Sequence, residues 1–113
     1  MSSFDHLTNK KWNLSGIPDI SDWQNEFKAE IPYIEFDDGG GVSGSTGCNI
    51  FHGDFSLTDT GIMIDPGAMT RKMCPGNGES IFMDKLNTAN AFEVDEQKLT
   101  LLNGTEALLE FSR

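Results

Sequence analysis

The chain has 113 residues, of which 37% are hydrophobic, and a formal net charge of −10 at pH 7 from 18 acidic and 8 basic residues. This length is enough for one domain with a core. The acidic excess argues against binding to nucleic acids or anionic membranes, because the chain would repel their phosphates, whereas a cationic partner is compatible with it. Eight Phe, two Trp and one Tyr supply large apolar side chains, which argues against disorder.

No apolar run approaches the roughly 18 residues of a transmembrane helix, so we expect no transmembrane segment. The N-terminal residues have neither the basic n-region nor the apolar h-region of a secretory leader. The chain is therefore either cytoplasmic or a mature form whose leader has been removed, and composition does not separate these two cases.

Residues 1–9 are expected to form a flexible arm, and residues 10–113 a single domain. A first strand is predicted over residues 10–17, because its apolar side chains alternate before a Gly-Pro break. Residues 19–31 carry apolar side chains at helical spacing, so a short helix is predicted there, with Ser21 as its N-cap and Pro32 as its end.

From Pro32 onward the pattern is mostly that of β-strands. Strands are predicted at residues 33–36, 42–46, 51–57, 61–64, 92–94, 99–101 and 107–112, with turns at Thr58-Asp59-Thr60, Asp95-Glu96-Gln97 and Asn103-Gly104. The last turn predicts a type I′ hairpin, because both of its residues tolerate a positive φ. One helix, capped by Asn77, is predicted over residues 77–89. The fold class is therefore mainly β: a small curled antiparallel sheet or barrel of about seven or eight strands with one or two packed helices.

The glycine-rich run DDGGGVSGSTGCNIF, residues 37–51, invites two enzymatic interpretations, and both fail. A phosphate loop needs Lys and Ser/Thr directly after its last glycine, but Cys48 and Asn49 follow Gly47. A nucleophile elbow fails because Ser45 stands where the motif needs a glycine. We interpret the run as a bent strand, since closing a small sheet requires such corners.

Thiol catalysis and metal binding have equally little support. In an extended strand, His52 would lie about 13 Å from Cys48, too far for direct proton transfer unless a bulge or turn at Asn49–Ile50 brings them together, and His6 lies in the predicted arm. The two Cys and two His lack the spacing of a zinc site. We therefore expect no catalytic residue, no metal site and no cofactor.

Several motifs together resemble the META domain family, that of the heat-shock protein HslJ and the Leishmania META proteins. They are an opening K-x-W-x-L (Lys10, Trp12, Leu14), VSGSTGCN, GAMTRKMC, a helix with E-x-x-F, LTLLN and LLEF, and they extend over about residues 10–112. The residues that carry the signature are Gly44, Gly47, Cys48, Asn49, Met69, Thr70 and Cys74. Residues 19–31 have no clear counterpart in the family.

The resemblance implies a compact β-rich fold and no catalytic residues, because no enzymatic activity is established for the family. Its bacterial members are commonly envelope lipoproteins or parts of exported proteins associated with stress or drug resistance. We therefore expect a non-enzymatic binding or interaction module linked to stress, in the periplasm or as an outer-membrane lipoprotein, with a cytoplasmic location as the alternative. We expect a monomer with an unknown protein partner.

The signature residues also allow physical interpretations. A disulfide between Cys48 and Cys74 would stabilise the fold by about 3–4 kcal/mol through loop closure, and buried free thiols or a reactive pair are the alternatives. Asn49 is expected to satisfy backbone groups where the strand turns. Arg71 is expected to pair with a carboxylate across the sheet, and contact with a ligand is the alternative.

The alternative function is a carrier of a small apolar ligand, since a barrel of about eight strands can enclose one. The residues expected to face such a ligand are Phe51, Phe55, Met63 and Phe92, with Arg71. A cavity lined by them would favour the carrier, and an exposed apolar patch would favour the interaction module.

Overall fold

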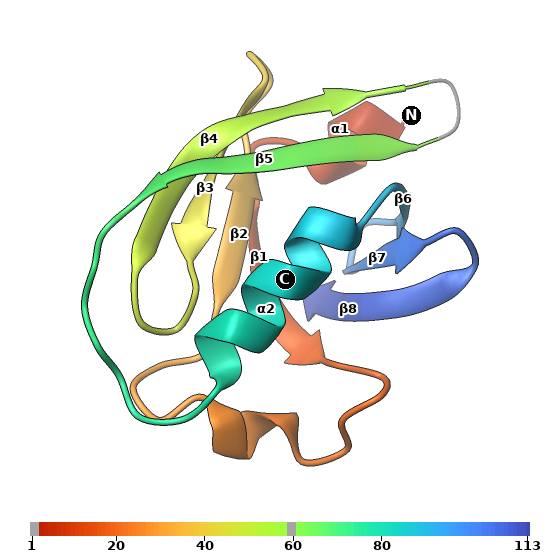
Figure 1. Cartoon of the computed structure of the whole chain (residues 1–113). Coiled ribbons are helices and arrows are strands. Elements are labelled where there is room, and N and C mark those ends of the chain that lie inside the picture. Colours follow the sequence, from red (N-terminus) through yellow and green to blue (C-terminus); the bar gives the residue numbers. More distant parts are fainter. Residues whose placement is uncertain (1–2, 59–60) are drawn as a thin grey trace.

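The computed structural model describes residues 3–58 and 61–113, which form one eight-stranded antiparallel sheet curled around a helix (Figure 1). The elements in chain order are α1 (Ser3–Leu7), β1 (Lys11–Gly16), the 3₁₀ turn η1 (Trp23–Glu26), β2 (Tyr33–Phe36), β3 (Gly41–Ser45), β4 (Ile50–Leu57), β5 (Ile62–Met69), α2 (Gly78–Thr88), β6 (Ala91–Val94), β7 (Lys98–Asn103) and β8 (Glu106–Ser112). The prediction of a mainly β fold with seven or eight strands is confirmed.

Two meanders build the sheet, in the order β5-β4-β3-β2-β1-β8-β7-β6, and they are joined where β1 pairs with β8. The two edges of the sheet approach each other where the Ile62 amide donates to the Asn90 carbonyl at 3.1 Å. Helix α2 contacts β5 and β8 and lies across the open side (Figure 1). Strands β5 and β6 are the two ends of the strand order and are not paired as neighbours, so the curled sheet is confirmed and the barrel is not.

The core lies between the concave face of the sheet and α2. Phe82 and Leu86 of α2 are fully buried. The Phe82 ring lies 6.5 Å from that of Phe51 on β4 and 6.2 Å from that of Phe111 on β8, measured between centroids. One helix face thus packs on both meanders, which confirms the helix predicted over residues 77–89. Asn77 occupies the N-cap position, but its side chain makes no capping bond.

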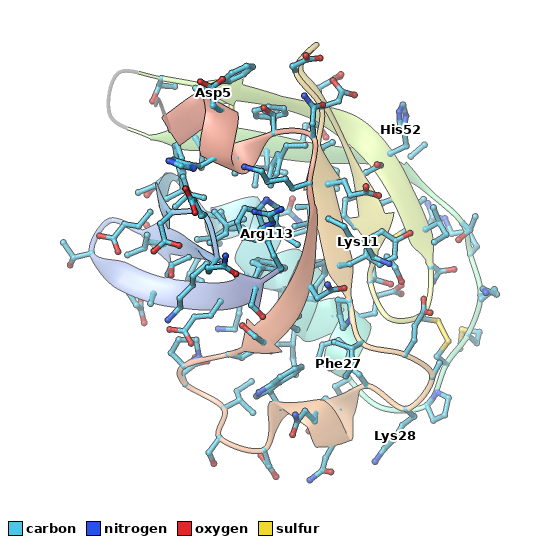
Figure 2. All side chains as sticks on the ribbon, turned by 180° about the vertical axis from the view of Figure 1, so that it is seen from behind. Asp5, Lys11, Phe27, Lys28, His52 and Arg113 are labelled. Carbon is cyan, nitrogen blue, oxygen red and sulfur yellow. A yellow bond between two sulfur atoms is a disulfide. The ribbon has the colours of Figure 1, made fainter. Side chains whose placement is uncertain are left out.

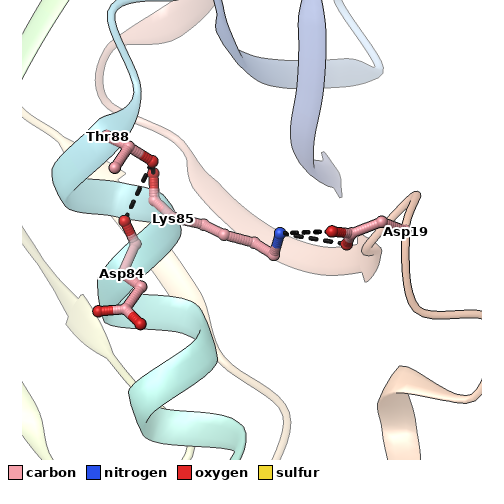
Figure 3. Close-up of polar contacts among 4 residues, drawn as sticks. All are labelled: Asp19, Asp84, Lys85 and Thr88. Carbon is pink, nitrogen blue, oxygen red and sulfur yellow. Dashed lines mark hydrogen bonds and ion pairs between the residues drawn. The ribbon is translucent and has the colours of Figure 1, made fainter.

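An ion pair fastens α2 to the segment that follows β1 (Figure 3). The Lys85 ammonium lies 3.1 Å from the Asp19 carboxylate. One turn further along, the Thr88 hydroxyl donates to the Asp84 carbonyl at 3.1 Å, a local bond back to the preceding turn of the helix.

The expectation of a flexible arm over residues 1–9 is corrected for residues 3–9. Ser3–Leu7 form helix α1, and Leu7 is fully buried. The Trp12 indole N–H donates to the Leu7 carbonyl at 3.0 Å, and the Asn9 amide donates to the Phe36 carbonyl at 2.7 Å. Because Leu7 belongs to no apolar pattern long enough to predict a helix, the sequence gives no sign of this order, and packing against the sheet, including β6, orders this segment.

The helix predicted over residues 19–31 is also wrong, since only η1 forms there. Asp22, not Ser21, occupies the N-cap position, and its side chain makes no capping bond. Trp23 and Phe27 are buried and contact each other edge to face, with centroids 6.1 Å apart. The apolar spacing therefore reflects burial of an irregular segment, which tertiary packing can produce without a helix.

The hairpin predicted at Asn103-Gly104 forms with a different turn. Asn103 pairs with Glu106, so Gly104 and Thr105 are the two loop residues. Gly104 has a φ of +63°, and among the described residues Asn9 alone has a positive φ without being glycine. A type I′ turn needs positive φ at both loop positions, so that prediction is wrong.

Strand β5 is longer than the predicted residues 61–64. Pro66 and Gly67 indicate a strand end, yet both lie inside β5. An edge strand tolerates proline where the backbone nitrogen faces outward, because no ladder hydrogen bond is needed there. Gly67, with a φ of +67°, lies where the register against β4 shifts. Asp59 and Thr60 of the predicted turn after β4 lie outside the described residues.

Within the described ranges, no helix combines the length and apolarity needed to cross a membrane.

Candidate functional site

Three segments that are distant in sequence meet at one corner of the fold. They are the β3–β4 turn (residues 46–49), the segment after β5 (residues 70–74) and Glu79 in the first turn of α2. We call these residues the signature corner. The β3–β4 turn and the connection from β5 to α2 lie at the same end of the molecule (Figure 1).

Asn49 is the centre of the signature corner, with 2% of its surface exposed. Its Oδ1 accepts from the Lys72 amide at 2.6 Å and from the Thr70 hydroxyl at 3.0 Å. Its Nδ2 donates to the Lys72 carbonyl at 3.1 Å and to Glu79 Oε2 at 2.7 Å. The side-chain amide thus pairs with the Lys72 peptide groups as a neighbouring strand would. It satisfies backbone groups, as predicted, but those of a segment over twenty residues away.

Thr46 joins the same network from the other side of the turn and is fully buried. Its hydroxyl donates to Glu79 Oε2 at 2.6 Å and accepts from the Asn49 amide at 2.8 Å. Glu79 Oε2 therefore receives two hydrogen bonds from within the protein. Because these bonds use the carboxylate to hold the turn, Glu79 acts here as a structural acceptor.

A disulfide completes the corner. Cys48 and Cys74 are bridged, with their Cα atoms 5.9 Å apart, which confirms the predicted pairing. The bond appears in yellow in Figure 2, at the end of the molecule that carries Lys28. Because both sulfurs are bonded to each other, neither is available as a thiolate nucleophile or metal ligand.

The outer surface of the corner carries positive charge and one exposed apolar side chain. Met73 is 98% exposed. Arg71 and Lys72 precede it and are exposed, as is Lys28 opposite them. A small open pocket of about 140 Å³ lies beside this loop, between Lys28, Lys72, Met73 and Glu79. It could hold one protein side chain but is small for a cofactor.

Of the residues predicted to face a ligand, Phe55 and Met63 line one open surface pocket, whereas Phe51 lines another. Phe51 is fully buried against Phe82, and Phe55 packs on Phe36 with centroids 4.9 Å apart, so both belong to the core. Met63 is 65% exposed on the outer face of β5. Phe92 is half-buried and packs against the core from β6. Arg71 is exposed, and the described residues include no ion pair that contains it.

The remaining signature residues have structural positions. Gly44 lies where an added Cβ would clash with the Tyr33 carbonyl oxygen, and Gly47 has a φ of +91°. Met69 is half-buried at the end of β5. His52 is exposed on β4. No group of three or more His, Cys, Asp or Glu side chains in the part of the chain described here is arranged to hold a metal ion.

Sequence reasoning missed Thr46 and Glu79 as members of the site. The E-x-x-F motif contained a signal for Glu79, because it combines this carboxylate with the buried Phe82 on one helical turn. Nothing local indicates that Glu79 meets the β3–β4 turn, since 30 residues separate it from Asn49.

A comparison with protein-family sequence patterns identifies the family of this chain. The sequence pattern of the META domain matches residues 5–113. The chain is a member of the META domain family. The match begins within α1, so the family resemblance includes part of the segment first interpreted as an arm.

Solved structures share the fold at low sequence identity. A crystal structure of a DUF4847 family protein from Bacteroides vulgatus has a TM-score of 0.74 and 14% identity, with coverage of 98% of this chain and 96% of that one. A protein from Burkholderia xenovorans, solved by NMR, has a TM-score of 0.72 and 20% identity, with coverage of 98% and 86%. Another NMR structure has a TM-score of 0.71 and 21% identity, with coverage of 99% and 95%. A comparison with curated protein sequences finds no match.

Proposed function

We propose that this META domain is a non-enzymatic interaction module of the bacterial envelope, linked to stress, that docks a protein partner through residues 70–76. We call these residues the docking loop. The observation that carries the proposal is Met73, a thioether that is 98% exposed on a loop fastened at both ends. Flexible, polarisable methionine side chains are over-represented at binding surfaces, where they adapt to an apolar partner.

The charges around Met73 indicate the chemistry of the partner. Glu79 is turned inward to Thr46 and Asn49, and Glu26 accepts from the Asn77 amide at 3.3 Å. By contrast, Arg71 and Lys72 are exposed, and neither belongs to an ion pair of the described residues. A partner that places an apolar side chain beside Met73 and carboxylates near these cations would be complementary.

A non-enzymatic role is supported by how the signature residues are used. Asn49, Thr46 and Glu79 hydrogen-bond to one another and to the backbone, and both cysteines are bonded to each other. These groups position a surface loop, and their reactive atoms are already occupied.

The envelope location is supported by the disulfide, because such bonds persist in oxidising compartments. The intact mass of protein isolated from its native cells, alkylated with and without prior reduction, tests this proposal. We expect no label until a reductant is added. Two labels without reductant would place the chain in the cytoplasm and overturn the envelope proposal.

A photo-crosslinking amino acid at position 73 tests the docking loop itself. We expect one crosslinked partner in native cells, and binding of that purified partner to fall about tenfold in Met73→Gln, a loss typical of a central contact. The matched control is Met63→Gln, which changes a second strongly exposed methionine of the described residues, on β5. Equal crosslinking from positions 63 and 73, or equal binding by the two variants, would contradict the proposal.

The carrier of a small apolar ligand remains the alternative. Phe51 and Phe55, which would have lined its cavity, fill the core instead, so this function has less support. Quenching of Trp12 or Trp23 fluorescence by a saturable apolar probe, with no effect of Met73→Gln, would favour the carrier over the docking module.

A further inference from the structure

The sulfur atoms of this protein differ widely in their access to solvent. Met73 is 98% exposed and Met63 is 65% exposed, whereas Met69 and Met83 are partly buried against the core. Both cysteines are in the disulfide. Among the described residues, the Met73 thioether is therefore the sulfur most open to a dissolved oxidant.

The backbone around Met73 is fastened on both sides. Lys72 is held through its amide and carbonyl by Asn49, at 2.6 and 3.1 Å, and Cys74 is held by the disulfide to Cys48. The side chain between these two attachments lies outside the core, so its sulfur stays accessible in the folded protein. Oxidation there needs no unfolding, in contrast to oxidation of a core methionine.

Peroxide chemistry fits this position. A lone pair on the thioether sulfur attacks one oxygen of hydrogen peroxide, the O–O bond breaks, an S–O bond forms, and water leaves after proton transfer. The sulfur loses two electrons and the peroxide gains them. Methionine sulfoxide reductases reverse the step with electrons from a dithiol. The product is a polar sulfoxide in place of an apolar thioether.

We propose that Met73 is a reversible oxidation site that switches the docking loop from an apolar to a polar tip and thereby releases the partner. The release of the partner, the regulatory half of the proposal, rests on the proposed function. The oxidation of Met73, the modification half, depends only on the exposure of its side chain. Such a switch would let a peroxide stress act directly on the interaction surface without disturbing the fold.

The modification half is tested on the full disulfide-bonded chain with limiting hydrogen peroxide and peptide mass mapping over time. We expect Met73 to be oxidised about tenfold faster than Met69 and Met83, because susceptibility follows exposure. Methionine sulfoxide reductases should restore the original mass, and the urea unfolding midpoint should stay unchanged. Oxidation of Met73 no faster than that of Met69, or failure of the enzymes to reduce it, would overturn the proposal.

The regulatory half is tested with the partner found by crosslinking. We expect oxidation of the chain to lower its affinity for that partner about tenfold, as expected for loss of a central contact. The variant Met73→Leu should bind normally and keep its affinity after peroxide treatment, whereas Met63→Leu should lose it like the unmodified chain. Unchanged affinity after complete oxidation of Met73 would overturn the switch. Failure to find any partner would count against the proposed function and leave the mapping result standing.

Discussion

The signature corner and the β7–β8 hairpin are stabilised by different kinds of contact: long-range in the corner and local in the hairpin. In the corner, side chains bridge distant segments: Thr46 and Asn49 bond to Glu79, 33 and 30 residues away. In the hairpin, Asn103 pairs with Glu106 across a two-residue turn, and apolar residues alternate toward the core. Local signals can therefore specify the hairpin, whereas the corner depends on contacts that exist only after the rest of the molecule has folded.

The largest expected difference between the two regions comes from the disulfide. Changing both Cys48 and Cys74 to Ala should lower the free energy of unfolding by about 3–4 kcal/mol, because the unfolded chain regains the entropy of the closed loop. Urea unfolding of the two chains measures this loss. Adding a reductant should destabilise the original chain by a similar amount and leave the double variant unchanged. A loss below about 1 kcal/mol would show that the network without the disulfide holds the corner.

Asn49→Ala should cost about 3 kcal/mol, because the Lys72 peptide groups and Glu79 lose partners in a buried site. The matched control is Asn103→Ala in the hairpin, where the side chain is exposed and accepts one bond from Asn90 at 3.1 Å. That change should cost below about 0.5 kcal/mol. Similar urea midpoints for the two variants would contradict the claim that side-chain hydrogen bonds stabilise the corner more than the hairpin.

Two glycines with positive φ provide the next comparison. Gly104→Ala should cost about 1 kcal/mol from the left-handed backbone, since its φ is +63° and nothing lies within 4 Å of an added Cβ. Gly47→Ala should cost about 2–3 kcal/mol, because its φ is +91° and the Cβ would lie 2.7 Å from the Glu30 carbonyl oxygen. Thermal unfolding of both variants measures the difference. A larger cost at Gly104 would mean that crowding at the corner is relieved by small shifts.

The smallest expected effect is a pH dependence at the β6–β7 turn. The amides of Gln97 and Lys98 bond to the Asp95 carboxylate and lower its pKa below the ordinary value of 3.8. A group with a lower pKa in the folded state stabilises the protein above the unfolded pKa, and this contribution is lost as the pH falls through the folded pKa. The urea midpoint should therefore fall on acidification below pH 3.8, and less steeply in Asp95→Asn. Parallel declines in the two chains would contradict this assignment.

The elements that the sequence predicted well are those with strong local patterns. The helix over residues 77–89 and the strand at Tyr33–Phe36 formed nearly as expected, because apolar periodicity selects both the element and its buried face. The wrong predictions lie in segments where a residue's burial does not follow the helical or strand spacing of its apolar neighbours. Trp23 and Phe27 have helical spacing but pack in an irregular segment, and Leu7 belongs to no long apolar pattern yet is fully buried.

In the candidate site, too, some contacts were predicted from the sequence and others were not. The motifs VSGSTGCN and GAMTRKMC led to the pairing of Cys48 with Cys74. They did not predict that Asn49 meets Thr70, or that Thr46 and Glu79 belong to the site, because nothing in the local sequence shows which distant groups a side chain will hydrogen-bond. Phe51 and Phe55 each pack against another ring in the core, and their predicted ligand-facing role stays a prediction.

The sequence by itself determined an acidic member of the META family, built mainly of β-strands with a helix packed against them, and paired two cysteines through its motifs. Those properties follow from composition, alternation and short motifs, which are local. Only the tertiary structure decided that α1 is part of the fold, that the sheet stays unclosed, and that Asn49 and the disulfide present Met73 to solvent. Each of these depends on which distant groups meet, and that is set by burial and hydrogen bonding across the whole chain.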